Sequence, residues 1–239
     1  MFNPRKGLMI DSKEKLEEAA LYYGILPFFR NNVSGLSVEE MTAPGCLFGG
    51  LHDDGCWEWK GPVIREKTTA YGKFFKRKAG FVSLKLLPDF LNYRRAAYPV
   101  KPDSTDEMIL DIIRENEGLS STELRQYIFG ATSGSRRPFD LPDNESPVKS
   151  KRSSLEGPLQ RLQMGGRLLI SDFKYKITKK GERYGWGIAV YSTPELWFGK
   201  SIIKTTGNLS PEDSLSKIID YVEQHFKRGD RKKILQLLL

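Results

Sequence analysis

The chain has 239 residues, of which 39% are hydrophobic and 28% are charged, and it carries a formal net charge of +8. This balance is typical of a folded globular protein and excludes a disordered chain. We expect a cytoplasmic protein without a membrane partner, because no apolar run approaches the roughly 18 residues of a membrane span and no signal-peptide core follows the first residues. The basic surplus favours polyanionic partners such as DNA, RNA or anionic lipid.

Residues 1–100 are predicted to form a first unit of short helices and strands, on the basis of hydrophobic spacing and of capping and turn residues. The predicted elements are a helix over residues 11–23, a short helix begun by the capping box of Ser37 and Glu40, two strands within residues 68–84 and a helix over residues 89–97. Residues 43–62 are rich in glycine and proline and are expected to be a loop with short extended pieces. Prolines at positions 99 and 102 mark a domain boundary.

Residues 101–200 carry sharper signals and predict a second unit. The predicted elements are a helix over residues 103–117, a helix begun by the capping box of Ser120 and Glu123, a helix that starts near Gly157 and ends at residues 165–166, and a hairpin of strands over residues 167–177 and 184–191. A polar segment, residues 131–151, is an unusually long loop before the third helix. A last helix over residues 210–226 is expected to pack back on a domain.

Three helices followed by a two-stranded hairpin is the element order of a winged helix, which here runs from about Thr105 to Thr193. We therefore predict an α+β fold of tandem winged-helix-like units, in which the C-terminal winged helix has the clearest pattern. The expected parts are an N-terminal helical and basic-aromatic domain over residues 1–100, the winged helix over residues 101–200, and a C-terminal helix over residues 201–239 that packs back.

Basic and polar side chains of this fold are candidates for contacts with DNA. The third helix of a winged helix enters the major groove, where polar side chains on its outer face read base edges. The predicted readers are Glu156, Gln160, Arg161 and Gln163. The hairpin is the wing, whose predicted phosphate contacts are Lys174, Lys176, Lys179, Lys180 and Arg183. The alternative is a winged helix that contacts protein, with its lysines merely solvated.

A second cluster of cations lies among aromatic residues in the first unit and comprises Lys60, Arg65, Lys67, Lys73, Lys76, Arg77, Lys78 and Lys85. Its candidate contacts with DNA, here called the second basic group, are Lys73, Lys76, Arg77 and Lys78. Nearby, Trp57 and Trp59 are candidates for stacking on unpaired bases, because cations beside exposed rings suit single-stranded or extruded nucleotides. Most of the aromatic residues in this segment are expected to belong to the core.

The two cysteines, Cys46 and Cys56, are expected to be free thiols. Together with His52, Asp53 and Asp54 they form the one cluster that could ligate a metal, but its spacing matches no zinc pattern, so we expect no metal site. The sequence contains no phosphate loop, nucleophile elbow or dinucleotide fingerprint, and we expect no cofactor.

Two stretches resemble the AlkZ-type bacterial DNA glycosylases, which are built from tandem winged-helix units around a DNA channel. The motifs LQRLQM (residues 159–164), YGWG (184–187) and YSTPE (191–195) are similar to that family's recognition helix, wing and exit. The motifs WEWKGP (57–62), GFVSL (80–84), PDF (88–90) and YRR (93–95) are similar to its aromatic-acid motif and the segment that follows. The resemblance implies a tandem winged-helix fold and double-stranded DNA as the partner.

The chain departs from this family at one important point. The family's glycosylases carry a Gln-x-Gln or closely related motif in the N-terminal half that positions the catalytic water, and this chain has no glutamine before Gln126. The remaining candidates for orienting water are Glu58, His52 and Asp54. Two hypotheses follow: a monomeric DNA-binding protein that recognises damaged or distorted DNA, with or without base removal, and a winged-helix transcriptional regulator that dimerises through residues 210–226.

Overall fold

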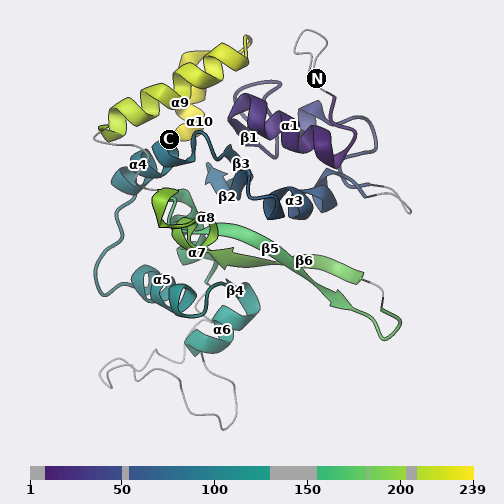
Figure 1. Ribbon diagram of the computed structural model, residues 1–239, viewed down its shortest axis with the longest axis vertical. Helices are drawn as coiled ribbons and strands as arrows, with labels where there is room; N and C mark the ends of the chain where they lie inside the picture. Colours follow the sequence, from purple (N-terminus) through teal and green to yellow (C-terminus); the bar gives the residue numbers. More distant parts are fainter. Residues whose placement is uncertain (1–8, 50–53, 130–154, 182, 203–208) are drawn as a thin grey trace.

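The computed structural model describes residues 9–49, 54–129, 155–181, 183–202 and 209–239 (Figure 1). The helices in these ranges are α1 (Lys13–Tyr23), α2 (Val38–Met41), α3 (Cys56–Arg65), α4 (Leu87–Ala97), α5 (Thr105–Glu115), α6 (Ser121–Phe129), α7 (Glu156–Met164), α8 (Pro194–Phe198), α9 (Pro211–His225) and α10 (Arg231–Leu238). The strands are β1 (Ile25–Pro27), β2 (Thr69–Phe75), β3 (Lys78–Ser83), β4 (Leu119–Ser120), β5 (Leu169–Ile177) and β6 (Arg183–Ser192). The strands form two small antiparallel sheets, in the orders β1-β3-β2 and β4-β6-β5. The chain is therefore a mixed α and β protein, as expected.

The first sheet is built around β3, which pairs with both β1 and β2. The two strands predicted within residues 68–84 are β2 and β3, so this prediction is confirmed. Lys76 and Arg77 join them with φ values of 46° and 68°, the left-handed region that a two-residue hairpin turn requires. A Cβ at Gly80 would lie 2.7 Å from the carbonyl oxygen of Leu26, so glycine is needed where β1 approaches β3.

Helix α3 overturns the expectation of a loop over residues 43–62, because it begins at Cys56 and contains Pro62. A proline inside a helix removes one backbone hydrogen bond. Val63 and Ile64 are fully buried, in a helix that packs against α1, β2 and β5. Burial of each of these side chains is worth about 1.5–3 kcal/mol. Together they offset the roughly 3 kcal/mol that a proline costs inside a helix.

The second sheet belongs to a unit with the element order α5, β4, α6, α7, β5 and β6. The predicted capping box is confirmed at the start of α6: the backbone N–H of Ser120 donates to Glu123 Oε2 at 2.8 Å, and the backbone N–H of Glu123 donates to Ser120 Oγ at 3.3 Å. Leu119 and Leu124 on either side of this cap are both buried. The cap therefore places α6 immediately after the short strand β4.

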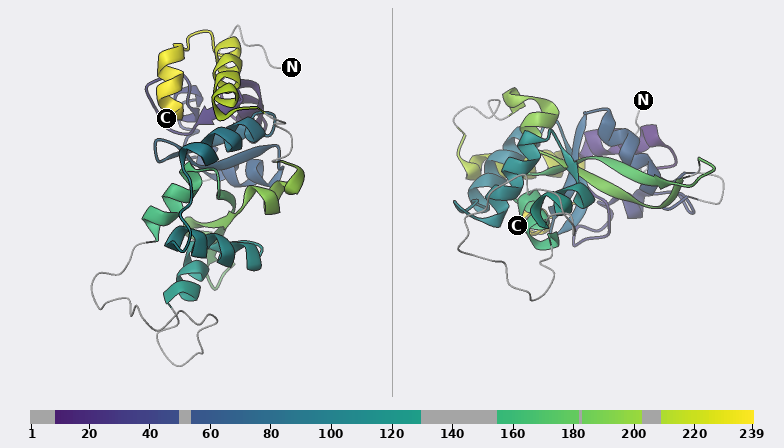
Figure 2. Two further views of the ribbon diagram at one scale, coloured as in Figure 1. Left: turned by 90° about the vertical axis from the view of Figure 1, so that its left-hand side faces the viewer. Right: turned by 90° about the horizontal axis from the view of Figure 1, so that it is seen from below.

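Contacts between the sheets join the two units into one body. Strand β5 contacts both α3 and β2, and α7 contacts both α5 and β2. At the other end of the molecule α9 packs against α4 and α1, with α10 beside it (Figure 2). Asn92 of α4 donates to Ser214 Oγ of α9 at 2.9 Å, and Lys217 of α9 pairs with the buried Asp89 at 2.7 Å. In the described ranges, no helix has the length and apolar character that crossing a membrane requires.

Candidate nucleic-acid interface

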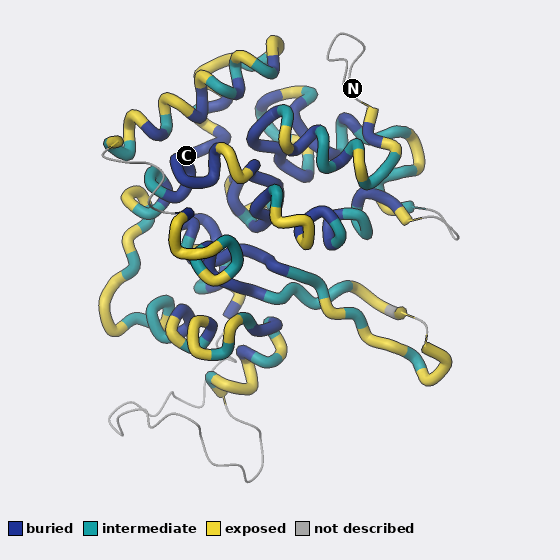
Figure 3. Tube along the Cα trace, viewed as in Figure 1, coloured by how far each residue is buried: buried dark blue, intermediate teal, exposed yellow. Residues whose placement is uncertain are grey.

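The β5–β6 hairpin extends away from the rest of its sheet, and its outer half is exposed (Figure 3). Exposed cationic side chains follow its strands and turn: Lys174, Lys176, Lys179, Lys180 and Arg183. Lys174 pairs with Glu123 at 2.8 Å. Within the described part of the chain, Lys176, Lys179 and Lys180 lie beyond ion-pair distance of any carboxylate. The hairpin therefore presents unpaired positive charge to solvent.

The inner part of the hairpin is fixed to α3 by a buried lysine and an ion pair. The Lys60 ammonium lies 3.8 Å from the ring centroid of Trp57 and 4.5 Å from that of Phe173 in β5, and it donates to the carbonyl oxygen of Trp57. Burial lowers the pKa of Lys60 from 10.5 to about 8, while the carboxylate of Glu58 acts in the opposite direction. Beside it, Arg65 of α3 pairs with Asp172 of β5 at 2.6 Å. These contacts set the position of the hairpin relative to the first unit.

Trp57 lies where α3, the loop before it and the hairpin meet. Its ring centroid is 5.5 Å from that of Trp186 in β6, in an edge-to-face contact, and 6.0 Å from that of Phe48. Trp57 and Trp59 are both half-buried and packed against the core. Trp186 exposes 72% of its surface, and sequence reasoning missed it as a site residue. Its signal was a tryptophan between two glycines in the motif YGWG, on the strand predicted as part of the wing.

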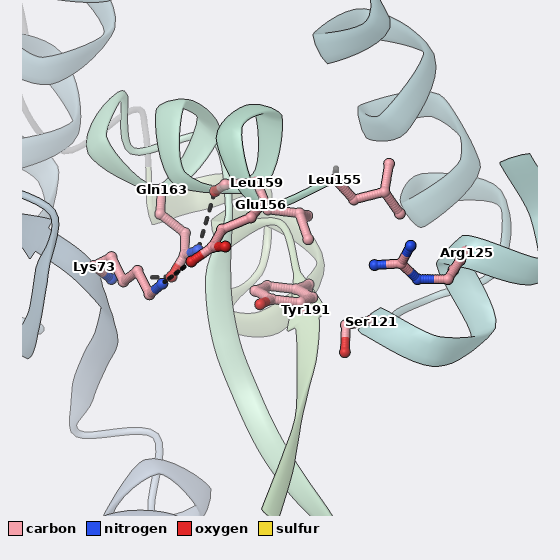
Figure 4. Close-up of a pocket in the computed structure, with 8 residues that line it drawn as sticks. All are labelled: Lys73, Ser121, Arg125, Leu155, Glu156, Leu159, Gln163 and Tyr191. Atoms are coloured by element: carbon pink, nitrogen blue, oxygen red, sulfur yellow. Dashed lines mark hydrogen bonds and ion pairs between the residues drawn. The ribbon is translucent and has the colours of Figure 1, made fainter. Parts of the chain in front are cut away.

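The second basic group is divided between a turn and a pocket. Lys76, Arg77 and Lys78 are exposed in the β2–β3 turn, where the backbone N–H of Arg77 donates to the sulfur of Met164 at the end of α7. Lys73 instead lines a pocket of about 220 Å³ between β2, α6 and α7, with its ammonium 3.8 Å from Glu156 (Figure 4). The structure thus places three of these cations in a turn and the fourth in a pocket.

Helix α7 is less accessible than the sequence pattern suggests. Gln163, expected on the outer face, is buried with 1% of its surface exposed, so that placement is wrong. Its Oε1 accepts the backbone N–H of Lys73 at 2.9 Å, because α7 packs directly on β2. Arg161 is exposed, but its guanidinium makes two hydrogen bonds, of 3.1 and 2.7 Å, to the carboxylate of Asp106 in α5. Gln160 is half-exposed.

Nearly the whole chain matches one known family. The family described as AlkZ related matches residues 10–239. The chain belongs to the AlkZ-related family. This membership confirms the resemblance found in the sequence and relates the protein to AlkZ-type DNA repair proteins. No curated protein and no solved structure matches the chain.

The three candidates for orienting water in this AlkZ-related protein differ in burial, and one lies outside the described residues. Glu58 is half-buried in the first turn of α3, where its Oε2 accepts the backbone N–H of Gly55 at 3.4 Å. Asp54 is exposed just before the helix, and His52 lies outside the described residues.

Cys56 is buried beside the Thr42 hydroxyl, and both it and Cys46 are free thiols. Burial raises the pKa of the Cys56 thiol.

Proposed function

We propose that this AlkZ-related protein binds double-stranded DNA, with the β5–β6 hairpin as its main contact with the phosphate backbone. In this interpretation α5, β4, α6, α7, β5 and β6 form a winged helix, and the hairpin is its wing. The observation that supports the proposal is the group of exposed hairpin cations, of which Lys176, Lys179 and Lys180 lack carboxylate partners among the described residues. Phosphate contacts of this kind supply most of the affinity of non-specific DNA binding.

Few side chains of α7 are free to contact base edges, so we propose that the protein distinguishes paired DNA sequences only weakly. Of the four predicted readers on α7, Gln163 is buried, Arg161 is held by Asp106 and Glu156 lies 3.8 Å from the ammonium of Lys73. This leaves Gln160 as the reader whose side chain is both accessible and outside an ion pair. We therefore expect weak preference among paired sequences, which suits a protein that recognises damaged or distorted DNA better than a regulator that reads an operator.

The test is the dependence of duplex affinity on salt concentration. If all five cations of the hairpin contact phosphates, the slope of log K against log salt is expected to be about −4.5. Lys179→Ala and Lys180→Ala should each reduce this slope by about one and weaken all paired duplexes equally. Lys232→Ala, which removes an exposed cation from α10, is the matched control and should leave the slope unchanged. A duplex affinity that stays constant from low to physiological salt concentration would refute the proposal that the protein binds DNA through these cations.

Base removal is not included in the proposed function. Hydrolysis of an N-glycosidic bond needs a water held by a fixed carboxylate, amide or imidazole. Glu58 is engaged at the start of α3, and Asp54 is exposed to solvent. An alkylated duplex incubated with excess protein and then with hot alkali should therefore show no strand breaks above background. Breaks that disappear in Glu58→Gln or in His52→Ala would assign the protein a glycosylase activity and identify its catalytic residue.

A further inference from the structure

The indole of Trp186 contacts Trp57 edge-to-face, but most of its surface is open to solvent. It exposes 72% of its surface, the largest exposed fraction of any large hydrophobic residue described, and it lies on the hairpin that projects from the body (Figure 1). Phe48 and Ile177 expose 57% and 56%. The rings of Phe48 and Trp186 both contact Trp57, and exposed rings that gather in this way are typical of binding surfaces.

The residues around Trp186 indicate which class of ligand this ring could bind. The ring of Trp57, which Trp186 contacts, packs against Phe28 and Phe29 at centroid distances of 5.6 and 6.3 Å. These contacts hold Trp57 in a fixed position beside Trp186. The same hairpin carries exposed cations, including Arg183, three residues before Trp186, whose guanidinium lies 5.1 Å from the Tyr175 ring. An exposed ring on a hairpin that also carries exposed cations is complementary to an aromatic base attached to phosphates.

We propose that Trp186, supported by Trp57, is a stacking site for one unpaired base of a DNA duplex. This inference rests on the proposed function, since the hairpin cations bring the duplex to the site. The edge-to-face contact with Trp57, with an interplanar angle of 88°, uses little of the Trp186 surface and leaves the rest open to a base. The substrate class is a duplex with a bulged or extruded nucleotide, because a base inside a continuous stack cannot reach the ring.

The experiment compares two duplexes of the same sequence, one fully paired and one with a single extra, unpaired thymine. The wild-type protein should bind the bulged duplex roughly 5- to 150-fold more tightly, the range expected when one base stacks on an aromatic side chain. Trp186→Ala should remove this preference and leave affinity for the paired duplex within about twofold, whereas Trp186→Phe should keep part of it. Phe129→Ala, which removes another exposed ring from α6, is the control and should keep the full preference.

The outcomes distinguish the inference from the function on which it rests. Absence of binding to both duplexes overturns the proposed function and the inference together. Salt-dependent binding of both duplexes with equal affinity overturns only the stacking site. A preference for the bulged duplex that survives in Trp186→Ala also overturns it, because the unpaired base would then be bound elsewhere. Binding of the wild type to anionic phospholipid vesicles, lost in Trp186→Ala without any preference between the duplexes, would assign the surface to lipid instead.

Discussion

Replacement of Lys60 by methionine should change the way in which stability depends on pH. Lys60 is 2% exposed and lies between the rings of Trp57 and Phe173, so its ammonium group has lost most of its contact with water. Methionine has a similar length and no charge, and it can fill the same space between the rings. The variant therefore removes the titrating group while keeping the contact between α3 and the hairpin.

The magnitude follows from the pKa of about 8 in the folded protein against 10.5 for an ordinary lysine. Between these two values the unfolded chain binds more protons than the folded protein, so the stability of the wild type rises with pH in this window. The titration of Lys60 disfavours the folded state by about 3 kcal/mol at pH 7.5, where the buried group is mostly charged, and by about 1 kcal/mol at pH 9.5, where folding requires the group to lose its proton. Stability of the wild type relative to Lys60→Met should therefore increase by about 2 kcal/mol between these pH values.

The assay is urea unfolding of both proteins at several pH values from 7.5 to 9.5, with the free energy of unfolding extrapolated to water. Because the other titrating groups are shared by both proteins, their contributions largely cancel in the difference. Parallel stability curves for the wild type and Lys60→Met would refute the reasoning, since they would mean that the folded protein leaves the Lys60 ammonium as well solvated as the unfolded chain does. A difference that falls with pH would also refute it.

Three further predictions concern packing, a buried hydrogen bond and an exposed ion pair. Gly80→Ala should destabilise the protein by about 3 kcal/mol in urea unfolding, because the added methyl group would lie 2.7 Å from a backbone oxygen, and normal stability would mean that β1 can move away. Gln163→Leu should cost about 1–3 kcal/mol by leaving the backbone N–H of Lys73 without its acceptor, with no change in preference among paired duplexes; altered preference would restore Gln163 as a reader. Hydrogen bonding to Lys174 holds the pKa of Glu123 at about 2, below its usual 4.5, so stability from this carboxylate is present above pH 4.5 and lost as the pH falls towards 2. Glu123→Gln should therefore flatten the acid side of the unfolding curve, and equal acid sensitivity of both proteins would contradict the assignment.

Sequence reasoning located the elements whose signals are local. Capping residues and hydrophobic spacing found α1, α5, α6 and both hairpins, because a Ser-x-x-Glu box or an alternating strand is specified by adjacent residues. Helix α3 was missed because the local signals of glycine and proline were outweighed by burial of Val63 and Ile64 against distant strands. No local pattern reports such burial.

The candidate site was predictable only in part, for the same reason. The exposed cations of the hairpin were predicted because lysines on two adjacent strands and their turn are visible in the sequence. Gln163 and Arg161 were assigned as readers from helical spacing alone, but their partners, Lys73 and Asp106, lie 90 and 55 positions away. The contact between Trp57 and Trp186 spans a still longer stretch of chain, and only packing of the hairpin on α3 brings the two rings together.

Because α7 contacts elements of both units, the two units cannot be separated without exposing buried surface. Cleavage in residues 98–104, at the boundary that the prolines suggest, would separate β2 from Gln163 and Met164 of α7 and uncover their buried faces. Neither fragment would then retain a complete core, since β5 also loses its contacts with α3. Protease nicking of that linker should accordingly yield two pieces that co-purify, and expression of either half alone should give insoluble protein.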